Sequence, residues 1–206
     1  MGLMSRYTRR MTIRRLLAAA AIIMFTSIAG PHASSSQTRQ KPDFQVQIWG
    51  DAAQTFITRM NAYADLRGKL EAGLKALAVT NRPVEILQAE NALAERLRVA
   101  RAKAKRGDIF SRRVRAAFRA ALRVESDAGT CAAIRDDNPG DFEYRVNGTY
   151  PKREPVSTVP PNMLAALPEL PPDVHYRFLG RDLVLHDTRA NIIIDEIPDA
   201  IRCAGR

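Results

Sequence analysis

Hydrophobic and polar residues alternate most regularly near the end of the chain, over residues 173–201. Three short runs rich in aromatic and β-branched residues are separated there by Gly180-Arg181 and by residues 187–191, a pattern typical of a β-meander. Glycine accepts a positive φ, so a two-residue type II′ turn at Gly180-Arg181 sets the register of the first two strands. This register places His175 opposite His186. It also gathers four apolar side chains on one face of the sheet, namely Tyr176, Phe178, Leu183 and Leu185.

The second connection is predicted to be a four-residue loop that ends at Asn191, a residue type that tolerates the left-handed backbone conformation. This loop sets Leu185 opposite Ile194 and extends the apolar face into the third strand. A sheet of two or three strands cannot bury such a face by itself. We therefore expect another part of the chain to pack on it, and the upstream helices are the candidates.

Upstream, over residues 51–124, apolar residues recur at the three- and four-residue spacings of amphipathic helices. The pattern is interrupted at residues 80–83 and at Gly107-Asp108, and Ser111 is expected to cap a third helix. The short link between the first two helices implies an antiparallel hairpin. The buried positions are expected to be, in chain order, Phe56, Met60, Tyr63, Leu70, Leu74, Leu77, Ile86, Leu93, Leu97, Ala100, Ala104, Val114, Phe118 and Leu122.

Residues 126–172 are rich in proline and aspartate, and mostly irregular structure is expected there. A small hairpin is predicted over residues 142–150, because Asn147-Gly148 strongly favours a tight turn. One helical turn is predicted at residues 162–167, between two proline clusters.

These elements predict the fold class α+β, with three N-terminal helices packed on a small C-terminal antiparallel β-meander. A single domain is expected over residues 44–206, with its helical part at 44–125 and the meander and tail at 173–206. A chain of 206 residues with 46% hydrophobic and 26% charged residues is in the range of one globular domain.

The first 33 residues have the pattern of an export signal. Residues 1–15 contain five arginines and no acidic residue, and the apolar run at residues 16–30 is short for a membrane span. Small residues offer cleavage points after Ala29 or Ala33. The protein is therefore expected in the periplasm or outside the cell.

Two features of the leader remain open. Residues 8–14 also resemble a twin-arginine motif, so both the Sec and the Tat export routes are open, and an uncleaved N-terminal anchor is a third alternative. The polar residues 34–43 are expected to form a flexible spacer between the signal and the domain.

Export bears on Cys131 and Cys203, because two cysteines in an oxidising compartment usually pair. Their spacing matches no zinc or haem motif. A bond between them would close a loop of about 70 residues and contribute about 4 kcal/mol in the chain-entropy model. Two free buried thiols are the alternative.

Basic residues are concentrated in the helical half of the chain. Residues 44–124 hold 16 Lys/Arg and 7 Asp/Glu, whereas residues 125–206 hold 9 and 14. One interpretation is a basic surface that binds an anionic envelope component, such as lipid head groups or cell-wall polymer. The other is that the acidic half folds back onto the basic helices. Another envelope protein is a further candidate partner, whereas an exported protein rarely meets nucleic acid.

His175 and His186 are the candidate metal ligands, because cross-strand neighbours can both reach one ion. Asp173 or Asp187 could add an oxygen ligand. No other cofactor is expected.

The residues that could act in catalysis form no known constellation. Ser126 and Ser157 lack a nucleophile elbow, and neither a Gly-rich phosphate loop nor an HExxH helix is present in the sequence. Asp136-Asp137 and Asp195-Glu196 are adjacent carboxylates, but neighbours on a strand point to opposite faces. No catalytic residue is therefore predicted.

Three segments resemble those of an uncharacterised family of small exported bacterial proteins: AKRGDIF at residues 104–110, VNGTYP at 146–151, and the region from YRFLGRDLVL onward at 176–197. This resemblance implies that the protein is a small exported bacterial protein located outside the cytoplasm, but it implies no activity. The last region is also similar to the C-terminal hairpin of periplasmic nickel/cobalt-homeostasis proteins.

The sequence therefore predicts an exported, non-enzymatic accessory or binding protein of the cell envelope. A periplasmic metal-binding protein that uses His175 and His186 is one alternative, and a small envelope hydrolase is another.

Overall fold

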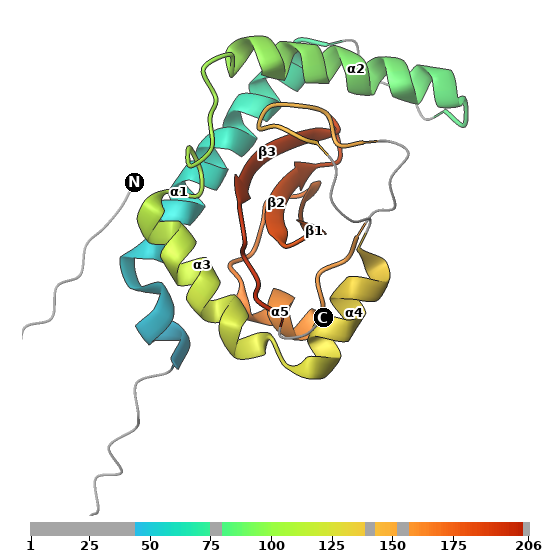
Figure 1. Ribbon diagram of the computed structural model, residues 1–206. Coiled ribbons are helices and arrows are strands. Elements are labelled where there is room, and N and C mark those ends of the chain that lie inside the picture. Colours follow the sequence, from blue (N-terminus) through green and yellow to red (C-terminus); the bar gives the residue numbers. More distant parts are fainter. Residues whose placement is uncertain (1–43, 75–79, 139–142, 152–156, 204–206) are drawn as a thin grey trace, which may run out of the picture. The chain divides into compact units, whose positions relative to one another are not determined.

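Helices precede strands along the chain (Figure 1). The computed structural model describes residues 44–74, 80–138, 143–151 and 157–203, which belong to one compact unit, Gln40–Arg206. The expected signal peptide and the whole of the expected spacer, residues 34–43, lie outside the described residues. The elements are α1 (Phe44–Ala72), α2 (Pro83–Ala100), α3 (Arg112–Glu125), α4 (Ala128–Asp137), α5 (Pro161–Ala166), β1 (Val174–Leu179), β2 (Asp182–Asp187) and β3 (Ile192–Ile197).

The predicted α+β fold class is confirmed. Helices α1, α2 and α3 contribute to one apolar core with the antiparallel sheet, whose strand order is β1-β2-β3. The predicted cap of α3 is also present, because the Ser111 side chain accepts a hydrogen bond from the amide of Val114. Helix α1 begins earlier than expected and is kinked at Gly50, whose φ of 38° is readily adopted by glycine.

The register of the first two strands is as predicted. His175 pairs with His186, Leu179 pairs with Asp182, and Gly180 has a φ of 58°. Asn191 also has a positive φ, of 49°, at the end of the predicted four-residue loop.

The pairing predicted between the second and third strands is wrong by one residue. Leu185 pairs with Asp195 instead of Ile194, because the register shifts at a β-bulge between Leu185 and His186. The bulge leaves Ile194 as an extra residue on β3. It lets both Ile194 and Asp195 face the helices, where Ile194 is buried in the apolar core.

Aromatic rings fill the space between the sheet and helices α1 and α3, which lie side by side in Figure 1. The ring of Phe118 lies 5.0 Å from that of Phe56, 4.9 Å from that of Phe110 and 5.8 Å from that of Tyr176, between centroids. Each side chain is buried. This contact covers the apolar face that the meander could not bury alone.

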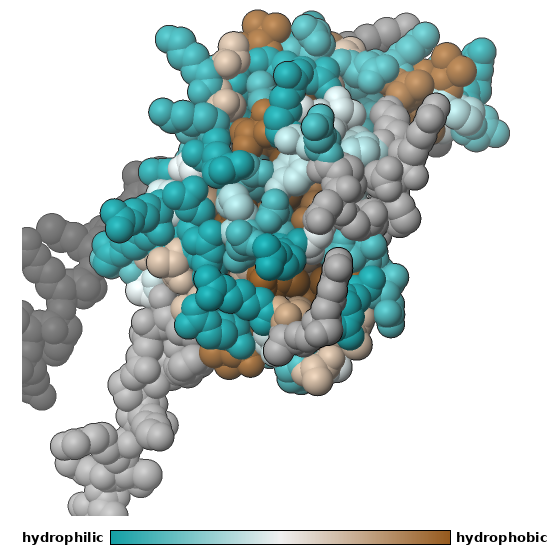
Figure 2. Space-filling model, viewed as in Figure 1, coloured by the Kyte–Doolittle hydropathy of each residue, from teal (hydrophilic) through white to brown (hydrophobic). Residues whose placement is uncertain are grey.

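Most predicted core positions of the helices are confirmed, but those near the ends of α2 are not. Ile86 is 46% exposed and Ala100 is also exposed, while Leu77 lies outside the described residues. Only the middle of α2, with Leu93 and Leu97, is buried against the core. Its N-terminal end is hydrophobic and exposed, as the brown colour at the upper right of Figure 2 shows.

Two predictions for residues 126–172 need correction. Helix α4 forms where irregular structure was expected. Asp127 caps it by accepting a hydrogen bond from the amide of Thr130, and the helix buries its own Ile134 side chain in the core. The expected helical turn is present as α5. The hairpin predicted around Asn147-Gly148 is absent from the described residues 143–150, although Phe142 lies outside them.

Residues 147–150 pair with the edge of β3, and within their own segment Gly148 donates to the carbonyl of Arg145 in a turn. The amide of Asn147 donates to the carbonyl of Ile193, and the amide of Ile193 donates to the carbonyl of Gly148. The edge of β3 therefore satisfies the backbone groups that the predicted hairpin would have paired. Tyr150 packs beside this edge on the far face of the sheet, with Leu179, Val184 and Ile193.

Ion pairs join the two halves of the chain. Arg67 of α1 pairs with Asp187, Arg106 pairs with Glu196, and Arg189 returns to Glu71 of α1. The described residues hold 21 Lys/Arg and 19 Asp/Glu in total. This arrangement favours the interpretation in which the acidic half folds back onto the basic helices.

The predicted disulfide is present between Cys131 of α4 and Cys203, with a Cα–Cα distance of 5.5 Å and a sequence separation of 72 residues. It ties the segment after β3 to α4. The bond therefore fixes the end of the chain to α4, whose C-cap residue Asn138 also forms hydrogen bonds with Gly180 in the turn of the meander.

Replacement of both cysteines, Cys131→Ser with Cys203→Ser, is expected to lower the melting temperature by about 10 °C, because the unfolded chain regains the entropy that the cross-link removes. Circular dichroism melts of the oxidised proteins would measure the change. Dithiothreitol should destabilise the wild type but leave the double variant unaffected. Equal melting temperatures would show that packing alone holds these ends together.

Candidate functional site

A groove with a volume of about 390 Å³ lies between β1 and the segment that contains α5. Its polar lining includes Glu169, His175 and Arg177. Its apolar lining includes Val159, Leu164, Leu167, Leu170 and Val174. An apolar concavity with few polar groups is typical of a ligand site.

The wall formed by α5 begins and ends at prolines. Pro160 and Pro161 preset the backbone for the first turn, and the chain leaves the helix at Leu167, before Pro168. The indole nitrogen of Trp49 donates to the carbonyl of Ala166, at 3.1 Å. These contacts fix the wall while leaving Leu164 46% exposed.

The opposite wall is β1, and Ser157 attaches the incoming chain to it. The Ser157 hydroxyl donates to the carbonyl of Phe178 and accepts from the amide of the same residue, at 3.0 Å. Ser157 is 1% exposed. This serine therefore serves as a backbone partner.

Arg177 brings a positive charge to the groove. Its Nη1 donates to the carbonyl of Ser157 at 2.9 Å, and its Nε has no hydrogen-bond partner among the described residues. No carboxylate of the described chain lies within ion-pair distance of it. Burial lowers the pKa of Arg177, but an arginine remains cationic at neutral pH.

His175 and His186 lie opposite one another, as predicted, but in different environments. His175 is exposed, whereas His186 is 5% exposed and stacks on Tyr150 with ring centroids 4.5 Å apart. The Nε2 of His186 donates to the side-chain oxygen of Asn191 at 2.9 Å. Coordination of a metal through this nitrogen would require His186 to leave Asn191.

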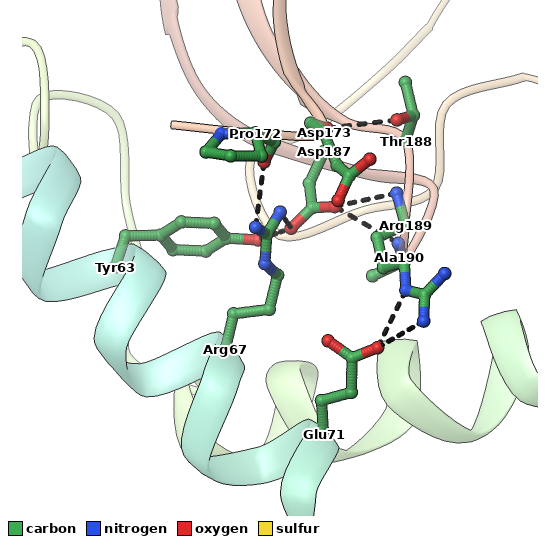
Figure 3. A network of polar contacts seen from close by, with 9 residues as sticks. All are labelled: Tyr63, Arg67, Glu71, Pro172, Asp173, Asp187, Thr188, Arg189 and Ala190. Atoms are coloured by element: carbon green, nitrogen blue, oxygen red, sulfur yellow. Dashed lines mark hydrogen bonds and ion pairs between the residues drawn. The ribbon is translucent and has the colours of Figure 1, made fainter. Parts of the chain in front are cut away.

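The expected oxygen ligands do not join the histidines. Among the described residues, no group of three or more His, Cys, Asp or Glu side chains is placed to hold a metal ion. Asp187 instead lies at the centre of a buried network between β2 and α1 (Figure 3). One carboxylate oxygen accepts from the hydroxyl of Tyr63 at 2.5 Å and from Arg67 at 3.3 Å. The other accepts from the amides of Arg189 and Ala190.

The Asp187 network is closed to substrates. Burial is the main cause that raises the pKa of Tyr63, and the neighbouring Asp187 carboxylate raises it further, so the phenol remains a hydrogen-bond donor. Arg67 also donates to the carbonyl of Pro172 at 2.8 Å. The network therefore anchors the ends of β1 and β2 to α1.

Asp195 is a second buried carboxylate with a structural role. Its oxygens accept from the amides of Gly107, Ile109 and Phe110 at 2.7–3.2 Å. These amides belong to residues 104–110, one of the segments that carries the family resemblance. The adjacent Glu196 pairs with Arg106, so the two neighbouring carboxylates serve different partners.

The remaining catalytic candidates each form a hydrogen bond with a different part of the chain. The Ser126 hydroxyl donates to the carbonyl of Leu122, and Asp137 accepts from the hydroxyl of Thr158 at 2.6 Å. Sequence reasoning did not find the groove, since its walls come from residues 158–170 and β1, and only the fold brings them together. The proline clusters around α5 were the available signal.

A pH dependence follows from the burial of His186. Burial lowers the pKa of His186, and its bond to Asn191 only partly opposes this. In the unfolded state the pKa of the His186 side chain is about 6.5, so as the pH falls the histidine is protonated in the unfolded state before it is protonated in the folded state. Stability contributed by the neutral ring is present above that pH and is lost below it.

The loss of stability between pH 7 and pH 5 is expected to be smaller in His186→Gln than in the wild type. Urea unfolding at each pH would measure it. His175→Gln is the matched control, because His175 is exposed and its replacement should change the dependence of the unfolding free energy on pH less. The same pH dependence of the unfolding free energy in the wild type and both variants would contradict the role of His186.

None of the helices in the described residues is both long and apolar enough to span a bilayer. Comparisons of the chain with models of protein families, with curated proteins and with solved structures find no match.

Proposed function

We propose that this protein is an exported, non-enzymatic binding protein of the cell envelope, whose ligand occupies the groove between α5 and β1. The groove itself is the observation that carries the proposal. It combines an apolar lining with an exposed Leu164 and a cationic Arg177 that forms no ion pair with a carboxylate of the described residues. A ligand with an apolar part and a negative charge would complement it.

Export is supported by two independent features. The N-terminal sequence has a basic region followed by a short apolar run. The bond between Cys131 and Cys203 agrees with an oxidising compartment outside the cytoplasm. Together they favour the periplasm or the extracellular space.

Binding is favoured over catalysis by the roles of the buried acidic residues. The described residues contain three such side chains, Asp187, Asp195 and Glu196, and each one holds two parts of the fold together. An anionic polymer on the helical surface is a weaker proposal, because several of its arginines already contact carboxylates or carbonyl groups of the C-terminal half.

The experiment uses mature protein isolated from the envelope fraction. Mass spectrometry should find an N-terminus near Gly30 or Ser34, and N-phenyl-1-naphthylamine should bind with increased fluorescence. Leu164→Glu should weaken this binding at least about tenfold, because the charge must be desolvated in an apolar groove.

The matched control is Ile86→Glu, since Ile86 is also 46% exposed but lies on α2. It should bind the probe as the wild type does. A cytoplasmic protein that retains Met1 would refute export. Equal weakening in the two variants, or no binding by the wild type, would refute the groove as the binding site.

A further inference from the structure

The edge of β1 that faces the groove is the free edge of the sheet. The strand order is β1-β2-β3, and residues 147–150 cover the edge of β3. In an antiparallel pair, alternate residues direct their N–H and C=O groups toward the neighbouring strand, and the residues between direct them away. One residue is therefore enough to identify which residues of β1 point their N–H and C=O groups away from β2.

Phe178 shows which residues of β1 face outward. Its N–H and C=O both bond to the hydroxyl of Ser157, outside the sheet. Two residues earlier, the N–H and C=O of Tyr176 point the same way. At the next outward position, the amide of Val174 donates to the carbonyl of Pro171 at 3.2 Å.

Tyr176 is thus the outward residue between Phe178, whose N–H and C=O are both bonded, and Val174, whose N–H is bonded. Within the described part of the chain, neither its N–H nor its C=O has a hydrogen-bond partner beyond the sheet. The residue is 5% exposed and lines the groove. Backbone groups in such surroundings normally have partners, because an unpaired buried group is costly.

An extended polypeptide matches these groups in a way that a simple apolar molecule does not. One of its residues can accept from the N–H of Tyr176 and donate to the C=O of Tyr176. Its alternate side chains then point to opposite sides, so one can enter the apolar part of the groove near Leu164 and Leu167.

Charge complementarity narrows the choice further. Arg177 follows Tyr176 on the strand, and no carboxylate of the described residues lies within ion-pair distance of it, although Glu169 lines the same groove. A carboxylate on the residue next to the one paired with Tyr176 would lie on the side of Arg177.

We infer that the groove binds an extended polypeptide segment, which adds to the edge of β1 at Tyr176 and places an apolar side chain beside Leu164 and a carboxylate beside Arg177. The inference rests on the proposed function and specifies its ligand class. The segment belongs to a protein partner and provides one pair of backbone hydrogen bonds.

The probe is a peptide selected from a displayed library of random heptapeptides against the mature protein. Selected sequences should alternate apolar and polar residues and include an acidic one. Two changes to the peptide should each weaken its binding to the wild-type protein about tenfold. One is methylation of the peptide's backbone nitrogen that donates to Tyr176, and the other is replacement of the peptide's acidic residue by its amide. The Tyr176 amide should become protected from hydrogen exchange when the peptide binds.

Two variants locate the contacts. Leu164→Glu should lose the peptide, while Ile86→Glu should keep it. Arg177→Gln should no longer distinguish the acidic peptide from its amide, a ratio that can be read even if overall affinity falls.

Failure of the inference is distinguishable from failure of the proposed function. If N-phenyl-1-naphthylamine binds in the groove but no peptide is selected, the groove takes a small apolar ligand and the inference is overturned. Peptides that bind Leu164→Glu as well as the wild type, or that leave the Tyr176 amide unprotected, would also overturn it.

Discussion

The apolar face of the sheet must be kept from water, and the rest of the structure depends on the helical layer that covers it. Two buried carboxylates, Asp187 and Asp195, attach the sheet to that layer at separate points. Removing one partner of a buried charged contact typically costs about 3–5 kcal/mol, which is a large part of the stability of a small domain. Apolar packing supplies the attraction, and these carboxylates make the position of the sheet specific.

This attachment also determines which surface remains for binding. Helices α1 and α3 cover one face of the sheet, and Tyr150 packs on the other. The edge of β3 is paired with residues 147–150. Among the described residues, the edge of β1 has partners outside the sheet at Phe178 and Val174 but not at Tyr176, which lies beside an apolar groove.

The parts of the fold that follow from local chemistry could be predicted from the sequence. Gly180 fixed the register of the first hairpin, Ser111 predicted the start of α3, and the two cysteines predicted their bond. The bulge beside Leu185 could not be predicted, because it forms where Asp195 reaches amides almost ninety residues away in sequence. Such distant partners leave no local pattern.

The candidate site was predicted only in fragments. His175 and His186 were correctly placed opposite one another, but the burial of His186 depends on Tyr150, which an expected hairpin would have placed elsewhere. The groove required knowledge that α5 lies beside β1. Ser157 was considered as a nucleophile, whereas its contacts with Phe178 make it a partner of the strand edge.

We predict that the sheet and the helical layer unfold as one unit, because buried carboxylates join them. Native-state hydrogen exchange of the Ile109 and Phe110 amides tests it most directly, since both donate to Asp195. We predict that they exchange with the same opening free energy as the amides of β2, the free energy of global unfolding. Exchange through a separate opening of lower free energy would show that the helical layer can leave the sheet while the sheet remains folded.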